Sequence, residues 1–90
     1  MALGAEYMHI RIYTKAYCSF CFAAKRLLKK RGLEYEEIPV LGNPAAEKEM
    51  HELTNGHTVP QILIDGECIG GFNELTELHM EDKLEHLMEQ

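Results

Sequence analysis

The sequence has no tryptophan, only three cysteines and three prolines, and no long run of hydrophobic residues. No stretch approaches the roughly 20 apolar residues that a membrane-spanning helix requires, so we expect no membrane association. The first ten residues, MALGAEYMHI, contain neither a basic start nor a long apolar core, and they do not predict a signal peptide. An odd number of cysteines is a poor basis for the disulfide framework of a secreted protein. These absences favour a reducing cytoplasm as the location.

The composition is that of one soluble globular domain. Ninety residues suffice for a single hydrophobic core, and 46% hydrophobic with 27% charged residues is typical of folded chains. We expect residues 1–90 to form one domain, with residues 1–8 as a loosely ordered lead. The net charge of −6 gives no reason to expect nucleic-acid binding. The basic residues between positions 25 and 31 are expected to form the solvated face of one helix.

Hydrophobic spacing predicts a strand, a helix and a second strand in the first half of the chain. Residues 9–13 (HIRIY) alternate apolar and polar side chains, as a strand does. After Cys18 apolar residues recur at helical spacing, and Gly32 stands where a left-handed helix end is expected. The apolar positions of this helix are Phe20, Cys21, Ala24, Leu27 and Leu28. Residues 33–40 (LEYEEIPV) predict a second strand, interrupted by Pro39.

The second half of the chain predicts a helix, a hairpin and a final helix. Asn43-Pro44 is typical of a helix start, and that helix should end near Asn55-Gly56. Its inner side would carry Ala46, Met50 and Leu53. Asp65-Gly66 supplies the tight turn of a hairpin over residues 60–71. Residues 73–90 predict the last helix. Its buried side would carry Leu75, Leu78, Leu84, Leu87 and Met88.

The resulting element order, β-α-β-α-β-β-α, indicates an α/β fold. A strand-helix-strand unit makes the first two strands parallel, with a right-handed crossover. The hairpin then adds antiparallel strands to the same sheet. We therefore expect one mixed four-stranded sheet flanked by helices.

Two of the three cysteines, Cys18 and Cys21, stand three residues apart, and three kinds of site use such a pair. A structural zinc site needs four ligands, but Cys68 has no cysteine near it, and His51 and His57 miss the usual spacing. A structural disulfide would close a loop too short to stabilise the fold much. A redox centre accounts for the pair best, and the other two sites remain as less favoured alternatives.

A redox role explains where Cys18 stands. It falls at the start of the predicted helix, next to unpaired backbone N–H groups and the positive end of the helix dipole, and Lys15 lies three residues earlier. Both features favour the thiolate form of Cys18. Cys21, one turn further on and facing inward, is placed to attack a mixed disulfide formed at Cys18. A stabilised thiolate is also a good leaving group, which suits a catalyst of thiol–disulfide exchange.

Three blocks of the sequence resemble, in order and in spacing, the signature blocks of the glutaredoxin family, with its bacterial glutaredoxin-3 type the most similar. They are IYTKAYCSFCFAAKRLL, HTVPQILIDG and IGGFNEL. The similarity runs from about His9 to the last helix. It implies a thioredoxin-like fold and a glutathione-dependent oxidoreductase that reduces protein disulfides and glutathione mixed disulfides. Cys18 would be the nucleophile and Cys21 the resolving thiol of a monomer that uses glutathione as co-substrate and no resident metal.

The resemblance also implies a glutathione site. Its residues would be Lys15, Tyr17, Thr58, Val59, Pro60, Gly71, Phe72, Asn73 and Glu74. Pro60 would be a cis-proline that turns the Val59 backbone toward the cysteinyl part of glutathione, although a trans proline opening an edge strand is the alternative from the residues alone. Asn73 and Glu74 would meet the γ-glutamyl end, with Asn73 as a simple helix cap the alternative. Lys15 would face the glycyl carboxylate.

The sequence departs from the family pattern at three places. Ser19-Phe20 replaces the usual Pro-Tyr between the cysteines, which leaves the redox potential open. Asn73-Glu74 replaces the common Asp-Asp, which removes one charge. Glu47 stands where many members have Arg or Gln, so either glutathione is held less tightly at that end or Lys48 takes over the glycyl carboxylate. Tyr17 would cover the thiols, or else be an ordinary exposed aromatic residue.

Two further predictions concern Cys68 and a second function. Cys68, on the second hairpin strand, is expected to be a small buried apolar residue. The alternative function is that of an iron–sulfur carrier, in which Cys18 and glutathione ligate a [2Fe–2S] cluster between two subunits. Some glutaredoxins that lack the motif proline do this, and Ser19 keeps the alternative open.

Overall fold

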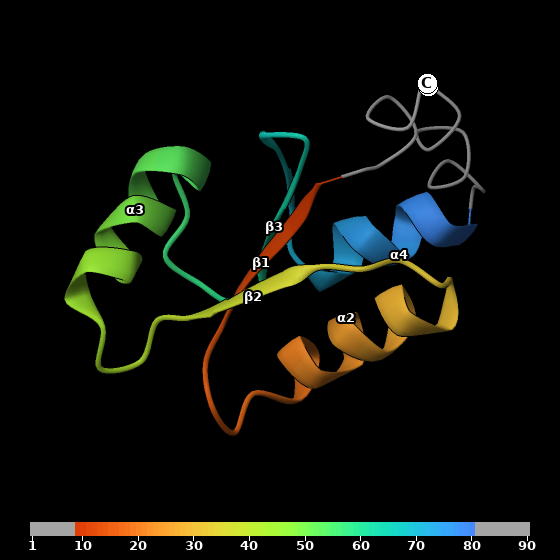
Figure 1. Ribbon diagram of the computed structural model, residues 1–90, viewed down its shortest axis with the longest axis horizontal. Coiled ribbons are helices and arrows are strands. Elements are labelled where there is room, and N and C mark those ends of the chain that lie inside the picture. The colour runs from red at the N-terminus through yellow and green to blue at the C-terminus, as the bar shows by residue number, and fades with distance from the viewer. Residues whose placement is uncertain (1–8, 81–90) are drawn as a thin grey trace.

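The computed structural model describes residues 9–80, which form a four-stranded sheet with three helices packed on it (Figure 1). The elements are β1 (Ile10–Thr14), α2 (Ser19–Lys30), β2 (Glu36–Pro39), α3 (Pro44–Thr54), β3 (Gln61–Ile64), β4 (Glu67–Gly70) and α4 (Phe72–Met80). The strands lie in the order β2-β1-β3-β4. β1 and β2 are parallel, whereas β3 is antiparallel to both β1 and β4. The predicted α/β class and the mixed sheet are confirmed. None of the helices in residues 9–80 is long and apolar enough to cross a membrane.

The end of α2 explains why β2 is shorter than the predicted strand over residues 33–40. Gly32 adopts a φ of 73°, and its N–H donates to the carbonyl of Lys29 at 2.9 Å. The N–H of Leu33 donates to the carbonyl of Leu28 at 3.0 Å. This pair of bonds is the Schellman motif, in which the N–H groups of a left-handed glycine and of the residue after it donate to the last carbonyls of the helix. The backbone N–H of Leu33 is therefore bonded to α2 and not to a neighbouring strand, and β2 begins only at Glu36.

The other predicted boundaries that fall within residues 9–80 agree closely with the structure, and the predicted end of the last helix at residue 90 lies outside them. The side chain of Asn43 accepts a hydrogen bond from Ala46 N at 3.3 Å and so caps α3, whose first residue is Pro44. Asp65 and Gly66 both have positive φ angles, as a tight hairpin turn requires. Three of the expected buried positions of the last helix, Leu84, Leu87 and Met88, lie outside the described residues.

Two hydrophobic clusters lie on opposite faces of the sheet, because neighbouring residues of a strand point to opposite sides. On one face, strand residues such as Ile12 pack with α2 and α4. On the other, Tyr13 and Leu63 pack with Met50 of α3. Figure 1 accordingly shows α3 apart from α2 and α4.

Two expected core residues are exposed instead. Phe20 has 60% of its surface exposed, since it precedes the buried Cys21 and consecutive helical residues point about 100° apart. Leu53 is 49% exposed, and Met50 is the only buried residue of α3. The inner face of each helix is thus narrower than the apolar pattern predicts.

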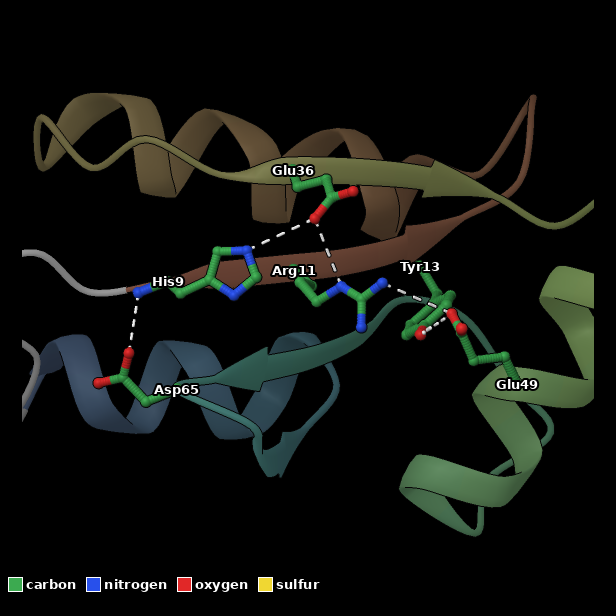
Figure 2. A network of polar contacts seen from close by, with 6 residues as sticks. All are labelled: His9, Arg11, Tyr13, Glu36, Glu49 and Asp65. Atoms are coloured by element: carbon green, nitrogen blue, oxygen red, sulfur yellow. Dashed lines mark hydrogen bonds and ion pairs between the residues drawn. The ribbon is translucent and has the colours of Figure 1, made fainter.

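A network of polar contacts fixes α3 to the sheet (Figure 2). The hydroxyl of the buried Tyr13 donates to Glu49 Oε1 at 2.6 Å. Arg11 lies between two carboxylates, with Nη2 3.6 Å from Glu49 and Nε 3.4 Å from Glu36. Burial, and then the hydrogen bond to Glu49, raise the pKa of Tyr13 to about 12. The neutral phenol is therefore the form that the folded protein stabilises.

We expect Tyr13→Phe to lower the free energy of unfolding at pH 8 by about 1 to 2 kcal/mol, because it removes a hydrogen bond to a carboxylate. The pKa of Tyr13 in the folded protein lies above the ordinary value of 10.0. Its contribution is therefore complete below pH 10 and is lost as the pH rises toward 12. Urea unfolding should show the difference between the two proteins shrinking over this range. Tyr17→Phe, at a fully exposed side chain, is the control and should match the parent; an equal loss there would contradict the assignment.

Candidate functional site

Cys18 lies at the exposed start of α2 and caps it. Its backbone is extended, with φ −108° and ψ 108°, and its sulfur accepts a hydrogen bond from Cys21 N at 3.1 Å. Its carbonyl accepts the first helical bond, from Phe22 N at 3.1 Å. Because the first N–H groups of a helix have no partner within it, a sulfur at this position can accept a hydrogen bond from one of them. It also lies at the positive end of the helix dipole.

Cys21 lies one turn deeper and is 2% exposed, whereas Cys18 is half-buried. Both are free thiols. Burial, and then the hydrogen bond to Cys18, raise the pKa of Cys21 to about 11. Cys21 is therefore a protonated thiol at neutral pH, held behind the sulfur that solvent can reach. This is the order expected of a resolving and an attacking thiol.

The two cysteines open into a groove of about 570 Å³, here called the cysteine groove. It is lined by Thr14, Lys15, Ala16, Tyr17, Cys18, Ser19, Cys21, Phe22, Lys25, Glu37 and Pro39. Lys15 thus shares the groove with Cys18, as the sequence predicts. Tyr17 adopts a φ of 60° and its side chain is fully exposed, so it does not cover the sulfur atoms.

Lys25 and Glu37 also line this groove, although neither was predicted from the sequence as a site residue. Lys25 Nζ lies 2.9 Å from Glu37 Oε2, and the same oxygen accepts a hydrogen bond from Thr14 Oγ1 at 2.8 Å. The hydrogen bond to Glu37 raises the pKa of Lys25, and the bond to Lys25 lowers that of Glu37. Lys25 therefore does not belong with the solvated basic face predicted for this helix. Its position, four residues after Cys21 and on the same side of the helix, is the signal that could have found it.

A second groove of about 570 Å³, here called the proline groove, contains the rest of the predicted site. It is lined by Phe20, Thr58, Val59, Pro60, Gln61, Cys68, Ile69, Gly70, Gly71, Phe72, Asn73 and Glu74. The Val59–Pro60 peptide bond is cis, as the family resemblance implies and the residues alone do not. The Phe20 ring lies 5.8 Å from the Phe72 ring, so the first turn of α2 borders both grooves. Phe20 was expected in the core and is a groove residue that the sequence analysis missed.

The start of α4 forms one wall of the proline groove. The first helical bond runs from Leu75 N to the Gly71 carbonyl at 3.0 Å, so Gly71 is the cap and Asn73 is not. Glu74 Oε1 reaches back and accepts from Gly71 N at 2.8 Å, which is half of a capping box. A Cβ atom on Gly71 would lie 3.1 Å from the Pro60 carbonyl oxygen, so a larger residue there would push these two segments apart by a few tenths of an ångström. The N–H groups of the first turn have no partner within the helix and are available to an anionic ligand.

The remaining candidates lie elsewhere or differ from expectation. Cys68 is half-buried rather than buried and lines the proline groove. Lys48 is exposed and lines neither groove. His57 Nδ1 and His51 Nε2 approach to 3.2 Å, but residues 9–80 contain no group of three or more side chains that could hold a metal ion.

Comparison with known proteins agrees with this geometry. The family model described as glutaredoxin matches residues 10–69. Glutaredoxin 3 of Escherichia coli K12 is 40% identical over 80 residues, which cover 89% of this chain and 96% of that protein. The solution structure of a glutaredoxin from Brucella melitensis is 36% identical, with a TM-score of 0.80 over 92% of this chain and 90% of that one. The crystal structure of a buckwheat glutaredoxin–glutathione complex is 28% identical, with a TM-score of 0.79 over 88% of this chain and 74% of that one.

The arrangement of the thiols predicts selective alkylation. In a Cys68→Ser background, iodoacetamide at pH 7 should modify Cys18 and leave Cys21 free, because Cys21 is buried and its pKa is raised to about 11. Mass spectrometry of peptides, sampled over time and pH, measures both sites. Cys21 should react appreciably only as the pH approaches 11. Equal rates at pH 7 would contradict the assigned order of the two sulfurs.

Proposed function

Because the chain belongs to the glutaredoxin family and is a thiol–disulfide oxidoreductase, we propose that glutathione is its reductant, and that glutathione mixed disulfides and protein disulfides are its substrates. The observation that carries the proposal is the arrangement of the two sulfurs. Cys18 caps α2 at the surface, and Cys21 is buried directly behind it. The grooves on either side of this turn provide space for a tripeptide thiol.

Three features support glutathione as the ligand. The backbone of Val59, before the cis-proline, lines a groove beside the cysteines and can pair with the cysteinyl residue of an extended peptide. The start of α4, with Glu74 beside it, offers N–H donors to the γ-glutamyl carboxylate and an acceptor to its ammonium group. Lys15, in the cysteine groove, offers a cation to the glycyl carboxylate. The buckwheat relative is described as a glutathione complex.

Deglutathionylation needs only Cys18. Its thiolate attacks the glutathione sulfur of a mixed disulfide, the bond to the substrate breaks, and the substrate leaves as a thiolate that takes a proton from water. A second glutathione thiolate then attacks the glutathione sulfur on Cys18, so that glutathione disulfide forms and Cys18 leaves as a thiolate. One free glutathione is oxidised as the substrate sulfur is reduced, because the other half of the glutathione disulfide comes from the mixed disulfide itself. The hydrogen bond from Cys21 N and the positive end of the helix dipole at this sulfur make Cys18 a good leaving group.

Reduction of a protein disulfide proceeds differently, because the substrate stays attached to Cys18 through its second cysteine. Cys21 is next to that bond and at high effective concentration, so it releases the substrate fastest. The Cys18–Cys21 disulfide that results is reduced by two glutathione molecules. We further propose that the protein acts as a monomer in a reducing compartment such as the cytoplasm, where glutathione is available. The iron–sulfur alternative, with Cys18 as ligand, stays a prediction.

The two cysteines should divide the activities. Cys18→Ser should abolish both, because it removes the attacking sulfur. Cys21→Ser should keep or raise deglutathionylation, since the internal disulfide can no longer form, but should lose most activity on protein disulfides. Steady-state rates of both variants on a glutathionylated peptide and on a protein disulfide provide the test. A Cys21→Ser variant that is inactive on the glutathionylated peptide would mean that the roles are wrong.

Glutathione binding should depend on Lys15 and not on Lys48. Lys15→Gln should raise the KM for glutathione about tenfold, which corresponds to one hydrogen bond to a charged group. Lys48→Gln removes the same charge outside both grooves and should leave the KM unchanged. Initial rates against glutathione concentration measure both. A larger effect at Lys48 would place the glycyl carboxylate beside α3 instead.

A further inference from the structure

Lys25 is set apart from the other basic residues of α2 by its neighbours. Its side chain is 27% exposed and lines the cysteine groove together with both cysteines. The 2.9 Å contact with Glu37 and the Thr14 hydroxyl on the same carboxylate oxygen hold the ammonium group on the cysteine side of the helix. Lys25 follows Cys21 by four residues, so the two side chains leave α2 on the same face.

This placement matters for the step in which Cys21 must lose its proton. Cys18 lies at the N-terminus of α2 and benefits from the helix dipole, whereas Cys21 is buried one turn inside and starts as a thiol. The ionisable groups that share its groove are Lys15 and Tyr17 from the loop after β1, Cys18 and Lys25 from α2, and Glu37 from β2. Of the two cations, Lys15 lies beside the surface sulfur in sequence, and Lys25 lies on the helix face that carries Cys21. Burial and the hydrogen bond to Cys18 raise the pKa of Cys21, whereas a backbone hydrogen bond from Lys15 and the positive charge of Lys25 act in the opposite direction; Lys25 is thus the side-chain charge that favours the Cys21 thiolate.

We propose that Lys25, held in place by Glu37 and Thr14, is a positioning residue for the resolving step that stabilises the Cys21 thiolate through its charge. The proposal rests on the proposed function, because it concerns the reduction of protein disulfides. The Cys21 thiol gives its proton to water in the cysteine groove, and the thiolate attacks the sulfur of Cys18. The bond between Cys18 and the substrate breaks as the Cys18–Cys21 bond forms. Cys21 is oxidised, and the substrate sulfur is reduced, leaves as a thiolate and takes a proton from water.

Neutralising Lys25 should therefore slow the second step and spare the first. Each unit by which the pKa of Cys21 rises lowers its thiolate fraction tenfold at neutral pH, while the intrinsic nucleophilicity rises about threefold. The net loss is about threefold for each unit of pKa. Attack by Cys18 does not involve the Cys21 thiolate and should change little.

Stopped-flow mixing of the reduced protein with one equivalent of 5,5′-dithiobis(2-nitrobenzoate) separates the two steps. In a Cys68→Ser background, attack by Cys18 releases one thionitrobenzoate in a bimolecular phase. Attack by Cys21 releases the second in a first-order phase, which Cys21→Ser should abolish. Lys25→Gln should slow the second phase about threefold or more at pH 7 and shift its pH midpoint upward, while Lys25→Arg should retain the parent rate. Lys30→Gln, which removes the same charge at an exposed position at the end of α2, is the matched control and should not differ from the parent.

Several results would overturn the proposal. They are an unchanged second phase in Lys25→Gln, a Lys25→Arg variant as slow as Lys25→Gln, and equal slowing by Lys30→Gln. Equal slowing of both phases by Lys25→Gln would show a general disturbance of the fold and would also overturn it. The probe is not glutathione, so the second phase can be measured even if the protein proves to use a different reductant. A parent protein whose rate does not depend on glutathione would contradict the proposed function alone.

Discussion

The unpaired N–H groups at the start of α2 are the constraint on which the site depends. A helix that begins directly after a loop needs an acceptor at its first turn, and here the acceptor is the sulfur of Cys18, 3.1 Å from Cys21 N. The cap lies at the helix end, where the reactive sulfur is half-buried and within reach of solvent. The residue three positions later lies one turn inside, where Ala24 and Leu28 continue the buried face of the helix. One helix start thus gives two identical side chains different surroundings.

The proline groove adds what a helix start cannot supply, which is the surface that we propose as the binding site for a peptide. Its walls come from the loop before β3, from β4 and from the first turn of α4. They can meet closely because Gly71 has no side chain to collide with the Pro60 carbonyl. Phe20 and Phe72 join this groove to the first turn of α2, which carries the cysteines. The two sulfur atoms and the proposed peptide-binding surface are therefore adjacent, although their residues are far apart in the chain.

Two consecutive glutamates of β2, Glu36 and Glu37, form ion pairs on opposite faces of the sheet. Glu36 pairs with Arg11 on the face that carries α3, where the Arg11, Glu49 and Tyr13 network holds that helix (Figure 2). Glu37 points to the opposite side, as the alternation of a strand requires, and holds Lys25 in the cysteine groove. The first pair supports the scaffold, and the second places a cation near the thiol that must be deprotonated.

The sequence by itself determined the element order and the two sulfurs through local rules, and it indicated residues around them only through its resemblance to the glutaredoxin family. Periodicity, the Asn43-Pro44 start and the Asp65-Gly66 turn act over a few residues, and the Cys-x-x-Cys spacing places one thiol a turn behind the other. Tertiary structure decided the rest. Phe20 became a groove residue rather than a core residue because the sheet covers only a narrow face of α2. Lys25 lies near the cysteines and not with the other basic residues of α2, because Glu37 of β2 binds its ammonium group. Glu37 is twelve residues away on another element, so only the packing of α2 against β2 brings the two together.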